Sequence, residues 1–449
     1  MMEIKQKIYN LLFKKINPEP LAFFRIVFGI LMLFSIIRFI SKGWVKEFYV
    51  EPQYFFKYPY FHWVQNPGEM GVYILFSVLL LSSLFITIGY KYRISIIAFF
   101  LSFIYIELID ITYYLNHYYF VSITAFLLIF MPAASCFSVD EIKKGEAKQI
   151  DNWSVLMIKF LVAIVYIFAG LSKLNYSWIV EAMPLAIWLP AHSNLPIVGK
   201  LMTMKETAYL FSWFGAAYDL FIVFFLIYPK TRKIAYLFVI IFHLSTWVLF
   251  NIGVFPFVMI ALTTIYFDSS FQTKVINILK SITNYNTYYI DNKNTHSYKQ
   301  RKQLIIMYSI VIFTLSQIAI PLRFMLYDGN LFWQEEGYRF SWRVMLMEKS
   351  GTVFFTILDK SNGKRYEVVN SNYLTPNQEK QMSTQPDLIL QFVGIIENEF
   401  ENKGITNVAI FADSYVKLND SYSKRYIDKS IDLTTIEYSD DLDKWILPY

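Results

Sequence analysis

The sequence predicts a mainly α-helical membrane protein, a polytopic bundle of about nine transmembrane helices followed by a small α+β extracytoplasmic domain. Of the 449 residues, 55% are hydrophobic and 17% charged, against about 45–50% and about 25% in soluble domains. Apolar stretches recur along the chain, and the positive charge between them is unevenly distributed. This composition excludes intrinsic disorder. The single cysteine, Cys136, excludes an intramolecular disulfide.

Residues 1–20 are predicted to form an amphipathic helix on the cytoplasmic surface of the membrane. Apolar residues at helical spacing face a set of lysines along this segment. The two sets are Ile4, Ile8, Leu11 and Leu12 against Lys5, Lys7, Lys14 and Lys15.

Residues 21–321 are predicted to form the membrane domain, because a spanning helix needs about 20 mostly apolar residues. The predicted spans are Leu21–Ile40, Gly71–Gly89, Ile94–Ile109, His117–Pro132, Val155–Leu171, Ala208–Tyr228, Ile234–Phe250, Val254–Phe267 and Leu304–Pro321. The third, fourth and eighth stretches are short, so we expect tilted, paired or re-entrant helices there.

The positive charge between the spans predicts the orientation. With a cytoplasmic N-terminus, the inside segments hold about three times as many Lys and Arg residues as the outside loops. The inside residues include Lys91, Arg93, Lys143, Lys144, Lys148, Lys230, Arg232 and Lys233, and the outside ones are Lys42, Lys46, Lys57, Lys173, Lys200 and Lys205. Topology thus explains the net charge of +6, so we expect a lipid bilayer and no nucleic acid as partner.

Residues 322–449 change character and are predicted to form the α+β domain, placed outside by the odd number of spans. Alternating segments indicate strands at Val353–Leu358, Tyr366–Val369 and Val408–Phe411. A turn is predicted at 361–363 and a helix near Pro386–Glu399. We expect a bacterial cell membrane, with this domain on its extracytoplasmic face.

Ionisable residues in or beside the spans are costly, which makes each a functional candidate. Lys173, His117, Asp110 and Glu107 gather at the predicted outer face, and Asp219 and His243 lie within spans. Structural alternatives remain open at this point. Lys173 can extend to the headgroups, His117 can be an interface anchor, and Asp219 can pair with His243 inside the bundle.

A lysine at a membrane boundary has a particular chemical use. Partial desolvation favours its neutral amine, which can act as a general base near neutral pH. An apolar pocket open to lipid suits a quinol, whose phenolic proton has a pKa of about 10. The sequence carries no phosphate-binding glycine loop, G-x-S-x-G elbow or H-E-x-x-H motif. With only His243 clearly inside a span, we expect no metal site.

Several motifs resemble the vitamin K-dependent gamma-glutamyl carboxylases and their bacterial relatives, the horizontally transferred transmembrane (HTTM) domain proteins. The matching segments run in order over nearly the whole chain. They include 20–29 (PLAFFRIVFG), 116–119 (NHYY), 165–175 (VYIFAGLSKLN), 218–220 (YDL), 242–243 (FH) and 336–343 (EGYRFSWR). Animal members carry a cysteine pair that has no counterpart beside Cys136.

The resemblance implies an enzyme, a carbon–carbon lyase that carboxylates protein glutamate while reduced vitamin K or menaquinol is epoxidised by molecular oxygen. Carbon dioxide is the second co-substrate, and a secreted glutamate-containing protein or peptide is the expected partner. Lys173 falls on the family's active-site base and His117 on the histidine that assists it. Substrate or cofactor binding is expected at Asn116, Tyr338, Trp342, His243 and Asp219.

Two other functions stay open on the sequence. One is a quinol epoxidase that acts without carboxylating glutamate. The other, of a different class, is a membrane transport or scaffold protein in which Asp219, His243 and Glu107 line a polar path.

Overall fold

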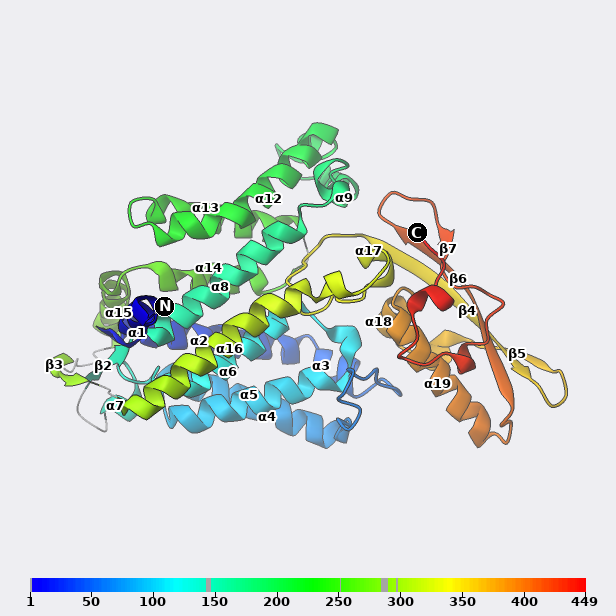
Figure 1. Ribbon diagram of the computed structural model, residues 1–449, viewed down its shortest axis with the longest axis horizontal. Coiled ribbons are helices and arrows are strands. Elements are labelled where there is room, and N and C mark those ends of the chain that lie inside the picture. Colours follow the sequence, from blue (N-terminus) through cyan, green and yellow to red (C-terminus); the bar gives the residue numbers. More distant parts are fainter. Residues whose placement is uncertain (1, 143–146, 251, 284–289, 296–297) are drawn as a thin grey trace.

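The computed structural model of the protein describes residues 2–142, 147–250, 252–283, 290–295 and 298–449. Figure 1 shows a helical bundle with the N-terminus at its left-hand end and a small strand-containing domain with the C-terminus at the right. The predicted mainly α fold class is therefore confirmed.

In the described part of the chain, seven helices are long and apolar enough to cross a membrane. These are α2 (Glu19–Ser41), α4 (Gly68–Ile88), α5 (Tyr92–Ile109), α8 (Trp153–Ser172), α12 (Lys205–Ile227), α13 (Arg232–Leu249) and α16 (Gln300–Leu322). Two shorter apolar helices are α6 (Asn116–Phe130) and α14 (Phe255–Thr263), the latter extended by a 3-10 turn. The fourth and eighth stretches are thus short, as predicted, whereas the third forms a helix of 18 residues. The chain is an integral membrane protein.

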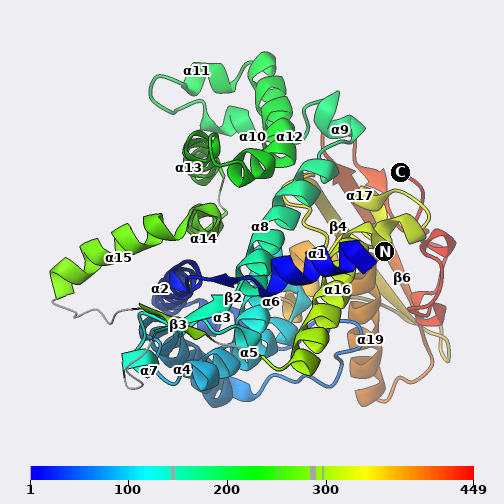
Figure 2. The same cartoon turned by 60° about the vertical axis from the view of Figure 1, so that its left-hand side comes forward.

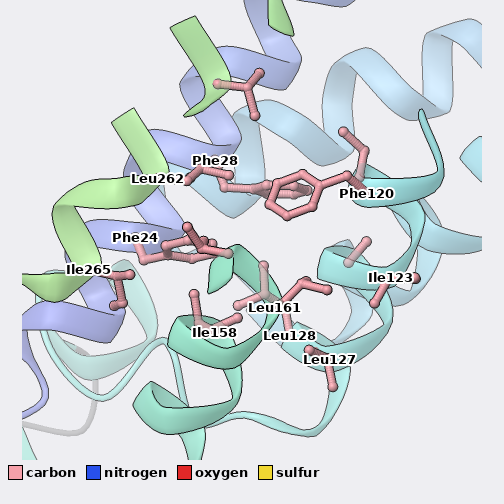
Figure 3. Packing of buried hydrophobic residues seen from close by; sticks show 14 of the residues in the cluster. Phe24, Phe28, Phe120, Ile123, Leu127, Leu128, Ile158, Leu161, Leu262 and Ile265 are labelled. Atoms are coloured by element: carbon pink, nitrogen blue, oxygen red, sulfur yellow. The ribbon is translucent and has the colours of Figure 1, made fainter. Parts of the chain in front are cut away.

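Helix α8 lies at the centre of the bundle and is the most buried of the seven, since 67% of the residues in its most apolar stretch are buried. It contacts α2, α6, α12, α14 and α16. Figure 3 shows side chains of α2, α6 and α14 packed against those of α8. The aromatic and aliphatic residues in that view include Phe24, Phe28, Phe120, Ile158, Leu161 and Leu262, all buried.

Short elements gather at the end of the bundle away from the C-terminal domain (Figure 1). They are α1 (Met2–Phe13), β1 (Lys15–Ile16), α7 (Val139–Ile142), β2 (Ala147–Asp151), α15 (Ser269–Thr283) and β3 (Ile290–Thr295). The predicted N-terminal helix is present, and it packs against α8 and α16. The sequence did not predict the sheet β1-β2-β3. Figure 2 shows α15 extending away from the bundle. Lys143 and Lys144, two of the predicted inside cations, lie outside the described residues.

The other end of the bundle carries short helices in its loops. They are α3 (Trp44–Tyr49), α9 (Tyr176–Ile179), α10 (Leu185–Trp188), α11 (Gly199–Met202) and α17 (Leu331–Gln334).

The C-terminal domain is an antiparallel sheet in the order β5-β4-β6-β7, packed against helix α19. Its elements are β4 (Lys349–Asp359), β5 (Arg365–Glu367), α18 (Pro376–Met382), α19 (Pro386–Asn402), β6 (Val408–Leu418) and β7 (Lys424–Arg425). The three predicted strands and the predicted helix are confirmed. Gly363 occupies the predicted turn with φ of +75°, a value that glycine adopts without a Cβ penalty.

Hydrogen bonds join the C-terminal domain to the bundle. Asp110, the first residue after α5, accepts a hydrogen bond from the Gln378 side chain of α18 (2.7 Å). The backbone N–H of Phe340 donates to the Tyr114 hydroxyl (2.7 Å). Asp110 therefore fastens the junction, while Glu107 accepts a hydrogen bond from Ser122 inside the bundle.

Candidate active site

Lys173 is the residue that follows α8, and its amine is turned toward α12. Gly170, one turn earlier, permits this, because a Cβ there would lie 2.7 Å from the backbone nitrogen of Leu220. The two helices are therefore close enough for the Lys173 Nζ to lie 2.6 Å from Asp219 Oδ2. The same nitrogen donates to the Ala169 carbonyl at 3.3 Å and lies 5.4 Å from the centre of the Trp178 ring.

Both members of this ion pair are buried, with Lys173 7% and Asp219 5% exposed. The structure therefore favours a lysine held inside the protein over one that extends to the headgroups. The pairing of Asp219 with His243, one of the sequence-based alternatives, is wrong. The carboxylate pairs with Lys173, and His243 Nε2 shares a hydrogen bond of 2.9 Å with the Tyr166 hydroxyl.

The Lys173 pocket is the name we give to the cavity of about 120 Å³ around this pair. It is walled mainly by aromatic and aliphatic side chains from α8, α9, α10, α12, α13 and α14. The lining includes Tyr166, Trp178, Leu185, Trp188, Phe211, Gly215, Phe242, His243, Phe250 and Phe255. Aromatic and aliphatic side chains predominate in this lining, and the ion pair and His243 are its polar groups.

The junction cavity is a second, larger space of about 870 Å³ between loops at this end of the bundle and the C-terminal domain. His117, Asn116 and Tyr338 line it. The His117 ring stacks on Phe255 with centroids 5.5 Å apart. Asn116 donates from Nδ2 to the Arg343 carbonyl (2.6 Å), which fixes residues 343–345 beside the start of α6.

Cations predominate among the charged residues of the junction cavity. They are Arg38, Arg339, Arg343, Lys349 and Lys380, against Glu335 and Glu348. Arg339 is bound to Asp387 through two nitrogens (2.6 and 3.3 Å), and Lys349 to Glu335 (2.8 Å). Burial lowers the pKa of Lys349, and it raises the pKa of the Tyr338 phenol, since each charged form is poorly solvated there.

The two cavities share one wall. Phe250, Ile252, Phe255, Val344 and Met345 line both of them. A ligand in the Lys173 pocket therefore lies next to a ligand in the junction cavity.

The predicted site residues thus fall into three groups. Lys173, Asp219 and His243 line the Lys173 pocket, and His117, Asn116 and Tyr338 line the junction cavity. Trp342 lines neither of them. It is 1% exposed and packs on Tyr119, with ring centroids 5.0 Å apart.

Sequence reasoning assigned no role to Tyr166, Trp178, Arg339, Arg343 or Lys349. Four of these lie within or beside the matching segments 165–175 and 336–343, which was the available signal. Nothing in the sequence indicated a further feature, the backbone conformation of residues 335–345. Four residues of this loop that are not glycine adopt left-handed φ values, which are uncommon and occur preferentially at functional sites. These residues are Glu335 (φ +63°), Phe340 (+59°), Trp342 (+60°) and Met345 (+55°).

Among the residues that the structure describes, no group of three or more His, Cys, Asp or Glu side chains is placed to hold a metal ion.

Comparison with known families gives two matches that together cover most of the chain. The HTTM domain matches residues 13–271, and the lumenal domain of vitamin K-dependent gamma-carboxylase matches residues 301–449. No solved structure matches the chain.

Proposed function

We propose that the chain, which belongs to the vitamin K-dependent gamma-carboxylase and HTTM-domain family, is a membrane enzyme that carboxylates protein glutamate at the expense of a quinol. One observation carries the proposal. Lys173 is buried 2.6 Å from Asp219 in an aromatic pocket, and that pocket shares a wall with the cavity of His117.

Lys173 is the proposed base for the phenolic proton of the quinol. An ammonium cannot accept a proton, so the pair with Asp219 must supply the neutral amine. In an apolar surrounding, a charged pair and its neutral tautomer, amine plus carboxylic acid, are closer in free energy than in water. Transfer of one proton from Lys173 Nζ to Asp219 Oδ2 over 2.6 Å leaves an amine that faces the pocket.

The other site residues have proposed positioning roles. Bound reduced vitamin K or menaquinol supplies, with molecular oxygen, the strong base that removes a γ-proton of glutamate, after which carbon dioxide adds to that carbon. His243, oriented by Tyr166, holds the ring, and His117 assists proton removal from the junction side. Asn116 and Tyr338 position the glutamate substrate. Trp342 holds the segment around Tyr338 in place by packing on Tyr119.

The proposed placement in the cell follows the charge distribution. The amphipathic segment 1–20 and the N-terminus are cytoplasmic, segment 21–321 crosses a bacterial cell membrane, and segment 322–449 is extracytoplasmic. The junction cavity then faces the compartment in which a secreted glutamate-containing protein is available.

The test gives purified protein reduced vitamin K or menaquinol, oxygen, labelled bicarbonate and a glutamate-rich peptide. We expect quinone epoxide together with label in the peptide. Epoxide without label overturns glutamate carboxylation and favours an epoxidase that acts on another substrate. If neither epoxide nor label forms, the enzyme proposal is overturned and the transport or scaffold function remains.

A further inference from the structure

Arg343 differs from the other buried cations of the junction cavity because no carboxylate balances it. Arg339 has Asp387 and Lys349 has Glu335, each within 2.8 Å. No carboxylate in the described part of the chain forms an ion pair with Arg343, although this residue is only 7% exposed. A buried charge is costly unless an opposite charge or hydrogen bonds compensate it, so Arg343 is a candidate for binding an anionic ligand.

The contacts of Arg343 hold its side chain without neutralising it. Its Nη1 donates a long hydrogen bond of 3.4 Å to the Pro321 carbonyl, and its guanidinium carbon lies 4.2 Å from the centre of the Phe324 ring. Burial lowers the pKa of Arg343, which is the direction expected of a cation that lacks a carboxylate. Asp387, by contrast, raises the pKa of Arg339 against the effect of burial.

The acids of the same cavity are already engaged. Glu335 accepts a hydrogen bond from Lys349 (2.8 Å), and Glu348 accepts one from the Trp188 indole (2.7 Å). Neither of them forms an ion pair with Arg343 in the described part of the chain.

Arg343 also stands where the two cavities meet. Its own carbonyl is held by Asn116, the neighbour of His117. The next two residues, Val344 and Met345, form part of the wall shared with the Lys173 pocket. An anion bound to this guanidinium in the junction cavity lies beside that wall.

We propose that Arg343 binds the side-chain carboxylate of the glutamate substrate and presents its γ-carbon to the shared wall. This inference rests on the proposed function, which it deepens by naming the substrate-orienting cation. The planar guanidinium fork suits a carboxylate, to which it can donate two parallel hydrogen bonds. The same chemistry suits bicarbonate, so the test must separate the two anions.

The test compares the binding of a fluorescent glutamate-containing peptide with that of the same peptide carrying glutamine. Each is titrated against purified wild-type protein, Arg343→Met, Arg343→Lys and the control Arg365→Met, which removes an exposed cation of β5. The ratio of the two dissociation constants is independent of the folded fraction, so a partly unfolded variant still gives a result.

We expect wild type and the control to prefer the glutamate peptide by about tenfold or more, since a charge-assisted hydrogen bond is lost with glutamine. In Arg343→Met the ratio should fall to about 1, and Arg343→Lys should lie between the two because it keeps the charge without the fork. An unchanged ratio in Arg343→Met overturns the inference.

A second measurement separates the two anions. The bicarbonate concentration that gives half-maximal labelling should be the same in wild type and Arg343→Lys. A rise of this concentration with an unchanged peptide ratio would assign Arg343 to bicarbonate and overturn the inference. If wild type forms neither epoxide nor label, the proposed function fails by itself, whereas binding still reports on Arg343.

Discussion

The two cavities share a wall of five residues but have opposite chemistry. The Lys173 pocket is small, aromatic and nearly neutral, because its one cation is paired with Asp219. The junction cavity is several times larger and rich in cations, of which Arg343 is buried without an ion-pair partner in the described part of the chain. The first lies among the membrane helices and the second beneath the C-terminal domain.

This difference supports the proposal that the two cavities bind different ligands. A pocket without net charge suits a lipophilic ring and a proton that moves within a pair. A cavity with an unbalanced cation suits a charged peptide side chain that arrives from water. Variants of the Lys173 pocket should therefore impair use of the quinol and leave peptide binding unchanged, and variants of the junction cavity should do the reverse.

The largest effect is expected at Lys173. Lys173→Ala removes the proposed base, so epoxide formation should fall by about 100-fold or more, the usual contribution of a general base. Mass spectrometry of the quinone products measures it. Lys200→Ala, at an exposed position of α11 at the same end of the bundle, is the control and should behave as wild type. Full epoxide formation by a folded Lys173→Ala protein would remove Lys173 from the mechanism.

A smaller loss is expected at its partner. Asp219→Asn keeps a side chain of the same shape but removes the carboxylate that accepts the proton of Lys173 and holds its amine in place. Epoxide formation should fall roughly 10- to 100-fold, because the amine of Lys173 is no longer positioned by its partner. In a transporter, Asp219→Asn should instead reduce activity more than Lys173→Ala does. A larger loss of activity in Asp219→Asn than in Lys173→Ala would therefore contradict the enzyme proposal.

Gly215 offers a steric test confined to the Lys173 pocket. A Cβ at this position of α12 meets only the Trp178 ring, at 3.9 Å, so Gly215→Ala should be tolerated. Gly215→Leu should fill the pocket and raise the KM for the quinol by about tenfold. Peptide affinity should be unchanged in both variants. A Leu variant that weakens peptide binding as much as quinol use would show that the cavities do not act separately.

The smallest effect concerns Asp110, which joins the two regions. Burial raises its pKa to about 6, despite hydrogen bonds from Thr112 and Gln378 that act in the opposite direction. The folded protein therefore holds this proton more tightly than the unfolded chain, and stability should fall as the pH rises from about 4 to about 6. The contribution is complete below about pH 4 and lost above about pH 6.

The side chain of Asp110→Asn cannot titrate. Between about pH 4 and about pH 6 the melting temperature of this variant should therefore fall by about 2–4 °C less than that of wild type. Thermal unfolding in detergent at several pH values measures it. The exposed Asp420→Asn serves as control and should keep the wild-type slope. An Asp110→Asn profile that matches wild type would show that Asp110 is not the titrating group.

The sequence predicted the membrane helices well because their apolar length is a local property. It also predicted strands β4 and β6 from their alternation, although both extend further than expected. The short sheet β1-β2-β3 was missed because its strands are two to six residues long and carry no pattern.

The site was predictable only in part. Lys173 and His117 could be named as candidates because ionisable groups beside spans are conspicuous. The partner of Lys173 was not, since the contact with Asp219 depends on how α8 packs against α12 at Gly170. The lack of an ion-pair partner for Arg343 could not be predicted either, because it depends on how the C-terminal domain packs against the bundle.

The most direct measurement follows the γ-hydrogen of the substrate itself. A peptide with tritium at the glutamate γ-carbon is supplied with quinol and oxygen, and release of tritium to water is recorded with and without carbon dioxide. If the base formed at the Lys173 pocket acts across the shared wall, tritium release requires quinol and oxygen, persists without carbon dioxide, and is lost in Lys173→Ala. Release that is independent of the quinol, or unchanged in that variant, would contradict coupling between the two cavities.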